Sequence, residues 1–482
     1  MRNKMIRYFT MKKKQYVPEI LFLVVLFCFI FLWAVVQPLN VSPDEHMRYQ
    51  IVEYIMKYGT LPEGGDPEIR NELWGISYAF SPITSYMIGA VFGKIAAFFS
   101  AAELAPVIGA RMVNVIFGTL TGFLCLRIGK RMLKPGAAWL FATLVCFLPG
   151  AVFINSYVNM DSIAVFSTAW IMLCWCKALQ DGWSGKLCVE LGLALSVCAL
   201  SYYNAYGFAL CTIFYFCISM LMCGEKRWDW KPMVKFGLLI TAVVLVFAGW
   251  WFIRNAVLYD GDFLGRQTSS MYGELYAVDE LKPSNIMTPK KMGKSIMDML
   301  FWIPGEWNYN WLSTVVVSFI GTFGYMNIFM PKAWSYLYVL FFAVGAVCVL
   351  PLLPRLLAVK DVKKEVTDYQ EDSEGSTTRM IVYRKKRWKM EGVFHLCLVG
   401  AAVIPVILLV IYAYSVDFQA QGRYLMPMLL PFMYFLAKGF ENLIERIKGN
   451  AGIRKCVYGA LCFLYILSSV LVYVFVFLPN YR

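Results

Sequence analysis

Apolar runs close to twenty residues long recur along the whole chain and alternate with shorter polar stretches. Runs of this length match the hydrocarbon core of a bilayer, whereas helices on the surface of a soluble domain carry a narrower apolar stripe. Thirteen segments are apolar enough to lie in a membrane. The pattern predicts an all-α polytopic membrane protein, and it leaves open which of these segments cross the bilayer.

The positions of lysine and arginine decide between the segments, because cytoplasmic loops carry an excess of these residues. The basic N-terminus and the basic loops at 127–134 and 355–391 must therefore lie on the cytoplasmic side. Segments 81–100 and 313–331 would break the required alternation of sides. The first contains serine, proline and lysine and the second is interrupted by glycine. We therefore expect both to be external helices beside the membrane.

The remaining segments predict eleven crossings. The first run has no small-residue cleavage site and is too long for a signal peptide, so we expect it to be retained. Two aromatic-rich loops, 39–104 and 254–331, are external. In the mixed-charge cytoplasmic loop 355–391, the stretch 362–379 is expected to be mobile. Residues 1–440 form the expected core, and 441–482 a basic loop and a last helix. The crossings lie at about 17–38, 105–126, 136–154, 162–179, 187–203, 207–223, 234–253, 332–354, 393–414, 425–440 and 456–478.

Composition and charge agree with this topology. Hydrophobic residues make up 59%, charged residues 16%, and mean hydropathy is +0.58, which excludes a disordered chain and an ordinary cytosolic enzyme. The net charge of +14 divides into roughly +17 inside and −3 outside. It therefore indicates orientation in the membrane and predicts no nucleic-acid partner. Most of the 14 cysteines fall in apolar runs without metal-ligand spacing, so we expect no zinc or redox site.

The polar residues that stand out gather on the predicted external face. Ser42, Pro43 and Glu45 form the pattern of a capping box that opens a helix. Glu45 then has a structural role available, but both Asp44 and Glu45 are candidate catalytic carboxylates. Asp44 either stabilises the helix dipole or accepts a proton or a cation. His46, a candidate substrate-binding residue with Arg48, is alternatively an interfacial polar residue.

A second cluster, Asn155 to Asp161, lies on the same face. Asp161 begins a helix, so helix capping is its simplest role. Beside Asp44 it would complete a pair of acids for general base chemistry or for a divalent cation such as Mg²⁺ or Mn²⁺. Asn159 is a candidate substrate-binding residue.

A third group is cationic and includes Arg254 and Arg423. Both arginines either extend to lipid headgroups or bind a phosphate in a bidentate manner. Gly422 would let the backbone approach a ligand beside Arg423, and the neighbours Gln421 and Tyr424 are candidate substrate and phosphate contacts.

Aromatic residues are dense between 299 and 325, where Trp307 is a candidate substrate contact. They either anchor the chain at the membrane interface or stack on a sugar or a lipid. No nucleotide-binding or common hydrolase motif is present.

Several short motifs carry a resemblance to known proteins. Pro43-Asp44-Glu45, Asn159-Met160-Asp161 and a basic turn after the second crossing resemble the GT-C superfamily of polyprenyl-phosphate-sugar-dependent glycosyltransferases. The segments 251–255, 318–324 and 421–427 resemble a bacterial family of predicted membrane proteins of unknown function. The resemblance extends from about residue 18 to residue 440. It implies an all-helical membrane core with external juxtamembrane helices.

By this resemblance Asp44 would be the general base or a carboxylate that orients the acceptor. Asp161 would be the second acid, and an arginine such as Arg423 the ligand of the lipid phosphate. The implied partners are a polyprenyl-phosphate-linked sugar, an envelope glycan, lipid or protein acceptor, and membrane lipids. The expected site is on the external face of the plasma membrane. The main alternative is a flippase or exporter of polyprenyl-linked glycans, but charges inside the crossings and two related halves, which are typical of transporters, are not evident. A non-catalytic scaffold is a third possibility.

Overall fold

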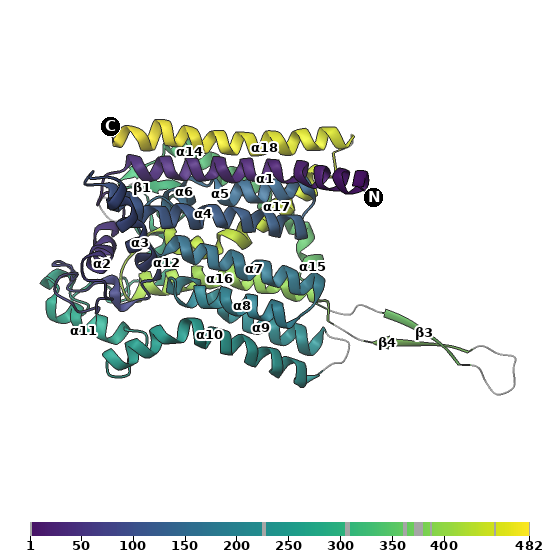
Figure 1. The fold of residues 1–482 in the computed structure, drawn as a ribbon, viewed down its shortest axis with the longest axis horizontal. Coiled ribbons are helices and arrows are strands. Elements are labelled where there is room, and N and C mark those ends of the chain that lie inside the picture. The colour runs from purple at the N-terminus through teal and green to yellow at the C-terminus, as the bar shows by residue number, and fades with distance from the viewer. Residues whose placement is uncertain are drawn as a thin grey trace.

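The computed structural model describes residues 2–223, 228–303, 309–359, 364–370, 379–385, 388–447 and 450–481. Long helices lie side by side along one axis and form the body of the molecule (Figure 1). The helices are α1 (Arg2–Val36), α2 (Glu45–Tyr58), α3 (Thr84–Phe99), α4 (Ala105–Met132), α5 (Pro135–Cys146), α6 (Pro149–Ile154), α7 (Asp161–Asp181), α8 (Gly185–Ala199), α9 (Tyr206–Met222), α10 (Trp230–Leu258), α11 (Arg266–Tyr276), α12 (Ile296–Phe301), α13 (Trp311–Gly321), α14 (Lys332–Val349), α15 (Leu353–Leu356), α16 (Met390–Ser415), α17 (Leu429–Ile444) and α18 (Ala451–Val472).

Eight segments of the described chain are long and apolar enough to cross a membrane, and they coincide with eight of the eleven predicted crossings. The other three correspond to α5 with α6, to α8 and to α17, which are shorter. Pro149 starts α6 as its first residue and separates it from α5, because proline cannot continue a helix from the preceding turn. These short helices pack inside the bundle, where α8 contacts α7 and α10, and α17 contacts α5 and α14.

The two apolar segments that we expected not to cross the membrane form α3 and α13, which have 16 and 11 residues. The helix α3 packs tightly against α4, since a Cβ on Gly109 would lie 2.5 Å from the carbonyl oxygen of Phe92. The helix α13 leads directly into a short antiparallel hairpin of β1 (Thr322–Phe323) and β2 (Ile328–Phe329). Both segments are too short to qualify as spans.

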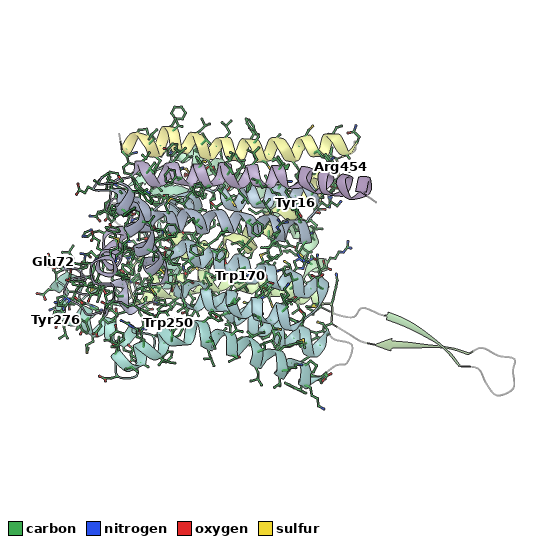
Figure 2. All side chains as sticks on the ribbon, in the orientation of Figure 1. Tyr16, Glu72, Trp170, Trp250, Tyr276 and Arg454 are labelled. Atoms are coloured by element: carbon green, nitrogen blue, oxygen red, sulfur yellow. The ribbon has the colours of Figure 1, made fainter. Side chains whose placement is uncertain are left out.

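The two ends of the bundle differ. The N-terminal end of α1 and a hairpin of β3 (Lys364–Gln370) and β4 (Arg379–Lys385) lie at one end, and α2, α3 and α11 lie at the other (Figure 1). These two strands lie in the mixed-charge loop 355–391 and pair antiparallel over seven residues each. Their sequences are rich in Val, Ile, Thr and Tyr, which favour strands. Figure 2 places Glu72 and Tyr276 at the α2–α3–α11 end and Arg454 toward the other.

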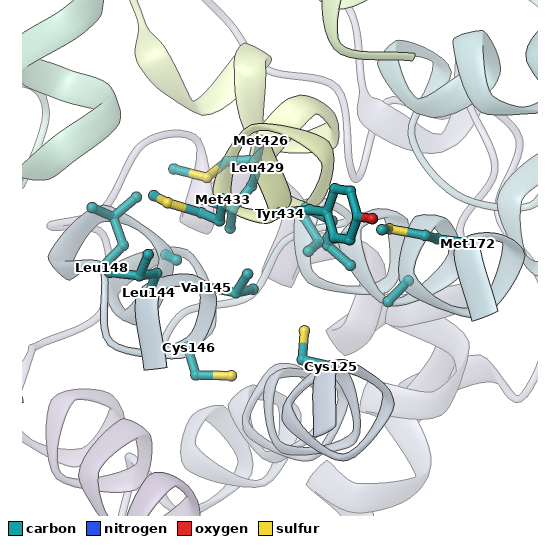
Figure 3. Close-up of a cluster of buried hydrophobic side chains, with 14 of the residues drawn as sticks. Cys125, Leu144, Val145, Cys146, Leu148, Met172, Met426, Leu429, Met433 and Tyr434 are labelled. Carbon is teal, nitrogen blue, oxygen red and sulfur yellow. The ribbon is translucent and has the colours of Figure 1, made fainter. Parts of the chain in front are cut away.

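The core is a continuous cluster of buried apolar side chains between the helices. In Figure 3, Leu144, Val145 and Leu148 face Met426, Leu429 and Met433. Cys125 and Cys146 belong to the same cluster, and the structure pairs no cysteine in a disulfide. The cysteines thus pack as small hydrophobic residues, as we expected from their positions.

Candidate active site

The site is built at the end of the bundle that carries α2, and it starts from an unusual backbone at Asp44. The helix α2 begins at Glu45 and is preceded by Asp44 with φ of 61°. The predicted capping box is therefore wrong, because a left-handed residue at position 44 interrupts the helix that Ser42 was expected to cap. The Ser42 hydroxyl instead donates to Oε1 of Gln37 at 2.7 Å. Left-handed geometry is tolerated best by Gly, Asn and Asp, which explains why an aspartate can occupy this position.

Glu45 is occupied by a buried ion pair. Both of its carboxylate oxygens accept from Arg111, from Nε and Nη2, each at 2.7 Å, and the Glu45 side chain is fully buried. Oε1 also accepts from the backbone N–H of Val158 at 3.0 Å. Arg111 further donates to the carbonyls of Ala34, Gln37 and Pro38. This pair joins the end of α1, the start of α2, α4 and the loop before α7, so we assign Glu45 a structural role and no catalytic one.

Asp44 faces two arginines instead. Its Oδ2 accepts from Nη2 of Arg423 at 2.7 Å and from Nη2 of Arg48 at 3.5 Å. Burial on its own would raise the pKa of Asp44, but the positive charges of Arg423 and Arg48 and hydrogen bonds from Arg423 and Tyr78 outweigh burial and lower the pKa to about 2. Asp44 is therefore ionised at neutral pH. Its side chain keeps 28% of its surface exposed, so a substrate can reach it.

Arg48 links Asp44 to Asp161. Nη1 of Arg48 lies 3.9 Å from Oδ2 of Asp161, and the guanidinium lies over the ring of Tyr78 at 4.8 Å. Asn159 caps α7, since its Oδ1 accepts from the backbone N–H groups of Asp161 and Ser162 and its amide donates to Ile154 and Tyr157. The start of α7 is therefore capped by the Asn159 side chain and not, as we predicted, by Asp161. The Asp161 carboxylate is left facing Arg48.

The two predicted acids do lie at one site, but a guanidinium stands between them. A divalent cation needs several oxygen ligands that are free of competing positive charge. Both carboxylates are instead beside Arg48, and Asp44 also binds Arg423. Within the described part of the chain, no group of three His, Cys, Asp or Glu residues is arranged to hold a metal. The residues present therefore do not fit a Mg²⁺ or Mn²⁺ site.

Arg423 is positioned by the contact of a 3₁₀ helix, η5 (Gly422–Met428), with α13. The N–H of Gly422 donates to Oγ of Ser318 at 2.7 Å, and a Cβ at this position would lie 2.1 Å from the backbone nitrogen of Phe319. Gly422 therefore allows the close approach of α13. Our prediction that it allows the approach of a ligand is not what the structure shows at this position. Nη2 of Arg423 also contacts the Tyr424 hydroxyl at 3.3 Å.

A cavity of about 550 Å³ adjoins this cluster. Aromatic residues form one part of its wall and apolar residues of α16 form another. A narrow pocket of about 10 Å³, which shares Tyr78, Ser81, Tyr202 and Tyr203 with it, reaches Arg48. The large cavity is lined by Tyr78, Tyr202, Tyr203, Arg266, Pro405, Leu408, Leu409, Tyr412 and Tyr424, among others.

Two predicted residues lie apart from the cluster, and a third cannot be placed against it. Arg254 donates to the carbonyl oxygen of Pro62 at 2.8 Å and lies over Trp251 at 5.2 Å. Arg254 lines none of the cavities at the site. Its hydrogen bond instead holds the loop that contains Pro62. His46 is exposed on α2, and it too lines none of these cavities. Trp307 lies outside the described residues. Gln421 and Tyr424 do line cavities beside Arg423.

Sequence reasoning missed several residues of the site. Tyr78, Tyr202 and Tyr203 surround the entrance to Arg48. Tyr202 and Tyr203 lie where two apolar runs meet at the predicted external face. Polar hydroxyl groups at this position could have indicated a site. Arg111 was also visible as a lone cation inside an apolar run, and such a residue requires a partner.

Comparison with known proteins identifies the family. Residues 70–432 match the model of the family described as predicted membrane protein (DUF2142). The chain belongs to this family. No curated protein matches it.

Solved structures share the fold of this DUF2142 protein. The apo oligosaccharyltransferase of Archaeoglobus fulgidus aligns with a TM-score of 0.55 and 14% identity over 95% of this chain and 56% of its own length. ArnT from Cupriavidus metallidurans bound to undecaprenyl phosphate aligns with a TM-score of 0.50 and 13% identity, over 97% of this chain and 74% of its own length. The archaeal oligosaccharyltransferase in complex with an inhibitory peptide and a dolichol-phosphate aligns with a TM-score of 0.53 and 13% identity, over 95% of this chain and 55% of its own length. The DUF2142 chain spans little more than half of the archaeal enzyme, and it has the predicted GT-C-like fold.

Proposed function

We propose that this protein is an inverting glycosyltransferase that moves a sugar from a polyprenyl-phosphate carrier to an envelope glycan, lipid or protein on the external face of the membrane. The observation that carries this proposal is the contact of ionised Asp44 with Arg423, with Arg48 beside it, next to a large aromatic and apolar cavity. One carboxylate and two guanidinium groups are the parts that such a transfer needs.

The cavity has the chemistry of a lipid-phosphate site. Pro405, Leu408 and Leu409 supply an apolar wall for a polyprenyl chain, and the passage past Tyr78 and Tyr202 leads to Arg48. Buried Nη1 and Nε atoms of both Arg48 and Arg423 have no hydrogen-bond partner, so both guanidinium groups have donors left for phosphate oxygens. Two of the structural neighbours hold a dolichol-phosphate and an undecaprenyl phosphate, which supports this class of donor.

The proposed reaction is a single displacement. The acceptor hydroxyl oxygen attacks the anomeric carbon of the sugar, and the bond between that carbon and the carrier phosphate breaks. The bonding electron pair leaves on the phosphate oxygen, where Arg423 and Arg48 neutralise the charge. Asp44 takes the proton of the acceptor hydroxyl. Attack from the face opposite the phosphate inverts the anomeric centre.

The low pKa of Asp44 predicts an unusual pH dependence. In the free enzyme Asp44 is ionised above its pKa of about 2, so kcat/KM should show no acid limb above about pH 4. Bound donor adds a negative phosphate and draws the arginines away from Asp44, which raises the pKa of the carboxyl. The acid limb of kcat should therefore lie at higher pH than that of kcat/KM. Rates measured between pH 4 and 8 test this order, and equal limbs near pH 6 would contradict it.

The phosphate role of Arg423 is tested by two matched substitutions. Arg423→Ala should weaken the binding of undecaprenyl phosphate by roughly 10-fold or more, since hydrogen bonds between charged groups contribute about 1.5–3 kcal/mol. Arg254→Ala removes an equal side chain that binds a carbonyl of the 61–62 loop, and it should leave this affinity unchanged. Native mass spectrometry or thermal protection gives both affinities. Equal affinities for the two variants would remove Arg423 from the proposed site.

A further inference from the structure

A second, smaller cavity is lined by Arg423. Its volume is about 20 Å³, and its walls include Tyr157, Thr322, Gln421 and Arg423. It shares no lining residue with the large cavity. Neighbouring residues of the chain line the two cavities, Arg423 the small one and Tyr424 the large one. The small cavity combines these polar side chains with apolar neighbours such as Phe153 and Ile154.

Several polar atoms around this small cavity lack partners. Thr322 Oγ1, Gln421 Oε1 and Arg423 Nη1 are buried without a hydrogen-bond partner of normal geometry, and the Tyr157 hydroxyl lies beside the Arg423 guanidinium. Tyr157 is completely buried and Thr322 keeps only 5% of its surface exposed. A buried polar group without a partner costs about 1–3 kcal/mol. Groups of this kind around one cavity are satisfied by a bound water or by a polar group of a ligand.

A chain of side-chain amides fixes which atom Gln421 presents. The carboxylate of Asp417 can only accept, so Gln419 must donate to it through Nε2, at 2.8 Å. The Oε1 of Gln419 is then turned toward Gln421 and accepts from its Nε2 at 2.7 Å. Gln421 is left with its Oε1 free. Asp417 thus acts through Gln419 to make Gln421 a hydrogen-bond acceptor at the cavity.

The donors and acceptors select one kind of group. A carbonyl oxygen such as Oε1 of Gln421 repels a phosphate oxygen and needs a hydrogen-bond donor. The Arg423 guanidinium can only donate, so it needs a hydrogen-bond acceptor. Burial raises the pKa of Tyr157 to about 12, so the Tyr157 phenol keeps its proton and can also donate. A hydroxyl both donates and accepts. The cavity of about 20 Å³ also has room for about one group of the size of water.

We infer that this cavity receives one hydroxyl group of the donor sugar, which donates to Gln421 and accepts from Arg423 and Tyr157. The inference rests on the proposed function and adds a recognition site for the sugar. The order of the parts then follows the donor molecule: polyprenyl chain in the large cavity, phosphate at Arg423, sugar at the small cavity. The enzyme would recognise the sugar through a hydrogen bond to a neutral hydroxyl, independently of its contacts with the carrier.

Binding measurements with and without the sugar test this inference. The purified full-length protein is titrated with undecaprenyl phosphate and with its glucosyl, mannosyl, galactosyl and arabinosyl forms. We expect at least one sugar-bearing lipid to bind wild type several-fold more tightly than the bare phosphate. Tyr157→Phe and Gln421→Met should each reduce this preference by about 3- to 10-fold, as expected for one hydrogen bond. Affinity for bare undecaprenyl phosphate should not change.

Controls separate this inference from the proposed function. Tyr336→Phe makes the same change at a tyrosine with 58% of its surface exposed, and it should behave as wild type. Thermal unfolding of each variant checks that it folds. If the bare phosphate binds but no sugar form binds more tightly, or if Tyr157→Phe and Gln421→Met keep the full preference, the hydroxyl site is overturned and the proposed donor class stands. If wild type binds none of these lipids, the proposed function itself fails.

Discussion

Asp44→Asn is expected to reduce sugar transfer by about 10²- to 10⁴-fold, which is the contribution of a general base. Asparagine has the same shape but accepts no proton at neutral pH. It also tolerates the left-handed backbone at this position, where φ is 61°. The variant should therefore fold, and its loss should appear in kcat. The measurement is the initial rate of release of free polyprenyl phosphate, together with thermal unfolding.

A matched control is available on the same end of the molecule. Asp279 is an exposed aspartate that pairs with Lys282, and Asp279→Asn should retain the wild-type rate. Normal turnover by Asp44→Asn would show that Asp44 is not the base. An equal loss in both variants would point to a general effect of charge at this end.

Arg111→Met is expected to lower the free energy of unfolding by about 3–5 kcal/mol, the usual cost of leaving one charge of a buried pair without its partner. The Glu45 carboxylate would remain fully buried with only the Val158 N–H, and three carbonyls at the end of α1 would lose their donor. The measurement is unfolding by denaturant in detergent. We expect the variant to be recovered in low yield.

Two further variants test the reason for this loss. Glu45→Leu combined with Arg111→Met removes both charges and should recover part of the stability, because an apolar pair of similar volume is tolerated in a core. Lys57→Met removes a cation from an exposed pair with Glu68 and should change stability little. A wild-type unfolding curve for Arg111→Met would mean that the pair does not hold the four segments together.

Much of the fold could be predicted from the chain, because twenty-residue apolar runs and the positions of lysine and arginine are local features. Eight helices that are long and apolar enough to cross a membrane coincide with eight of the predicted crossings, and the two expected external segments form the shorter helices α3 and α13. The short helices α5, α8 and α17 are covered by other helices, so their length is set by packing and not by the thickness of a bilayer. The hydrophobic pattern therefore predicts the positions of these three helices along the chain but not the residues at which they begin and end.

The site was predicted only in outline. Topology brought Asp44, Asp161 and Arg423 to one end, because loops on one side of a bilayer share one surface. It could not show that Arg48 stands between the two acids. Nor could it show that Glu45 binds Arg111, 66 residues away, since such contacts depend on packing between helices. Gly422 illustrates the same limit, because the close neighbour that requires glycine is α13.

The proposed transfer of a sugar from a polyprenyl-phosphate carrier depends on the cluster of Asp44, Arg423 and Arg48. The most direct test incubates the purified protein with the glucosyl, mannosyl, galactosyl and arabinosyl forms of undecaprenyl phosphate and a crude envelope acceptor fraction. Free undecaprenyl phosphate and labelled acceptor should appear together with wild type and not with Asp44→Asn. Transport of a polyprenyl-linked glycan across vesicle membranes without release of the carrier phosphate would contradict the account.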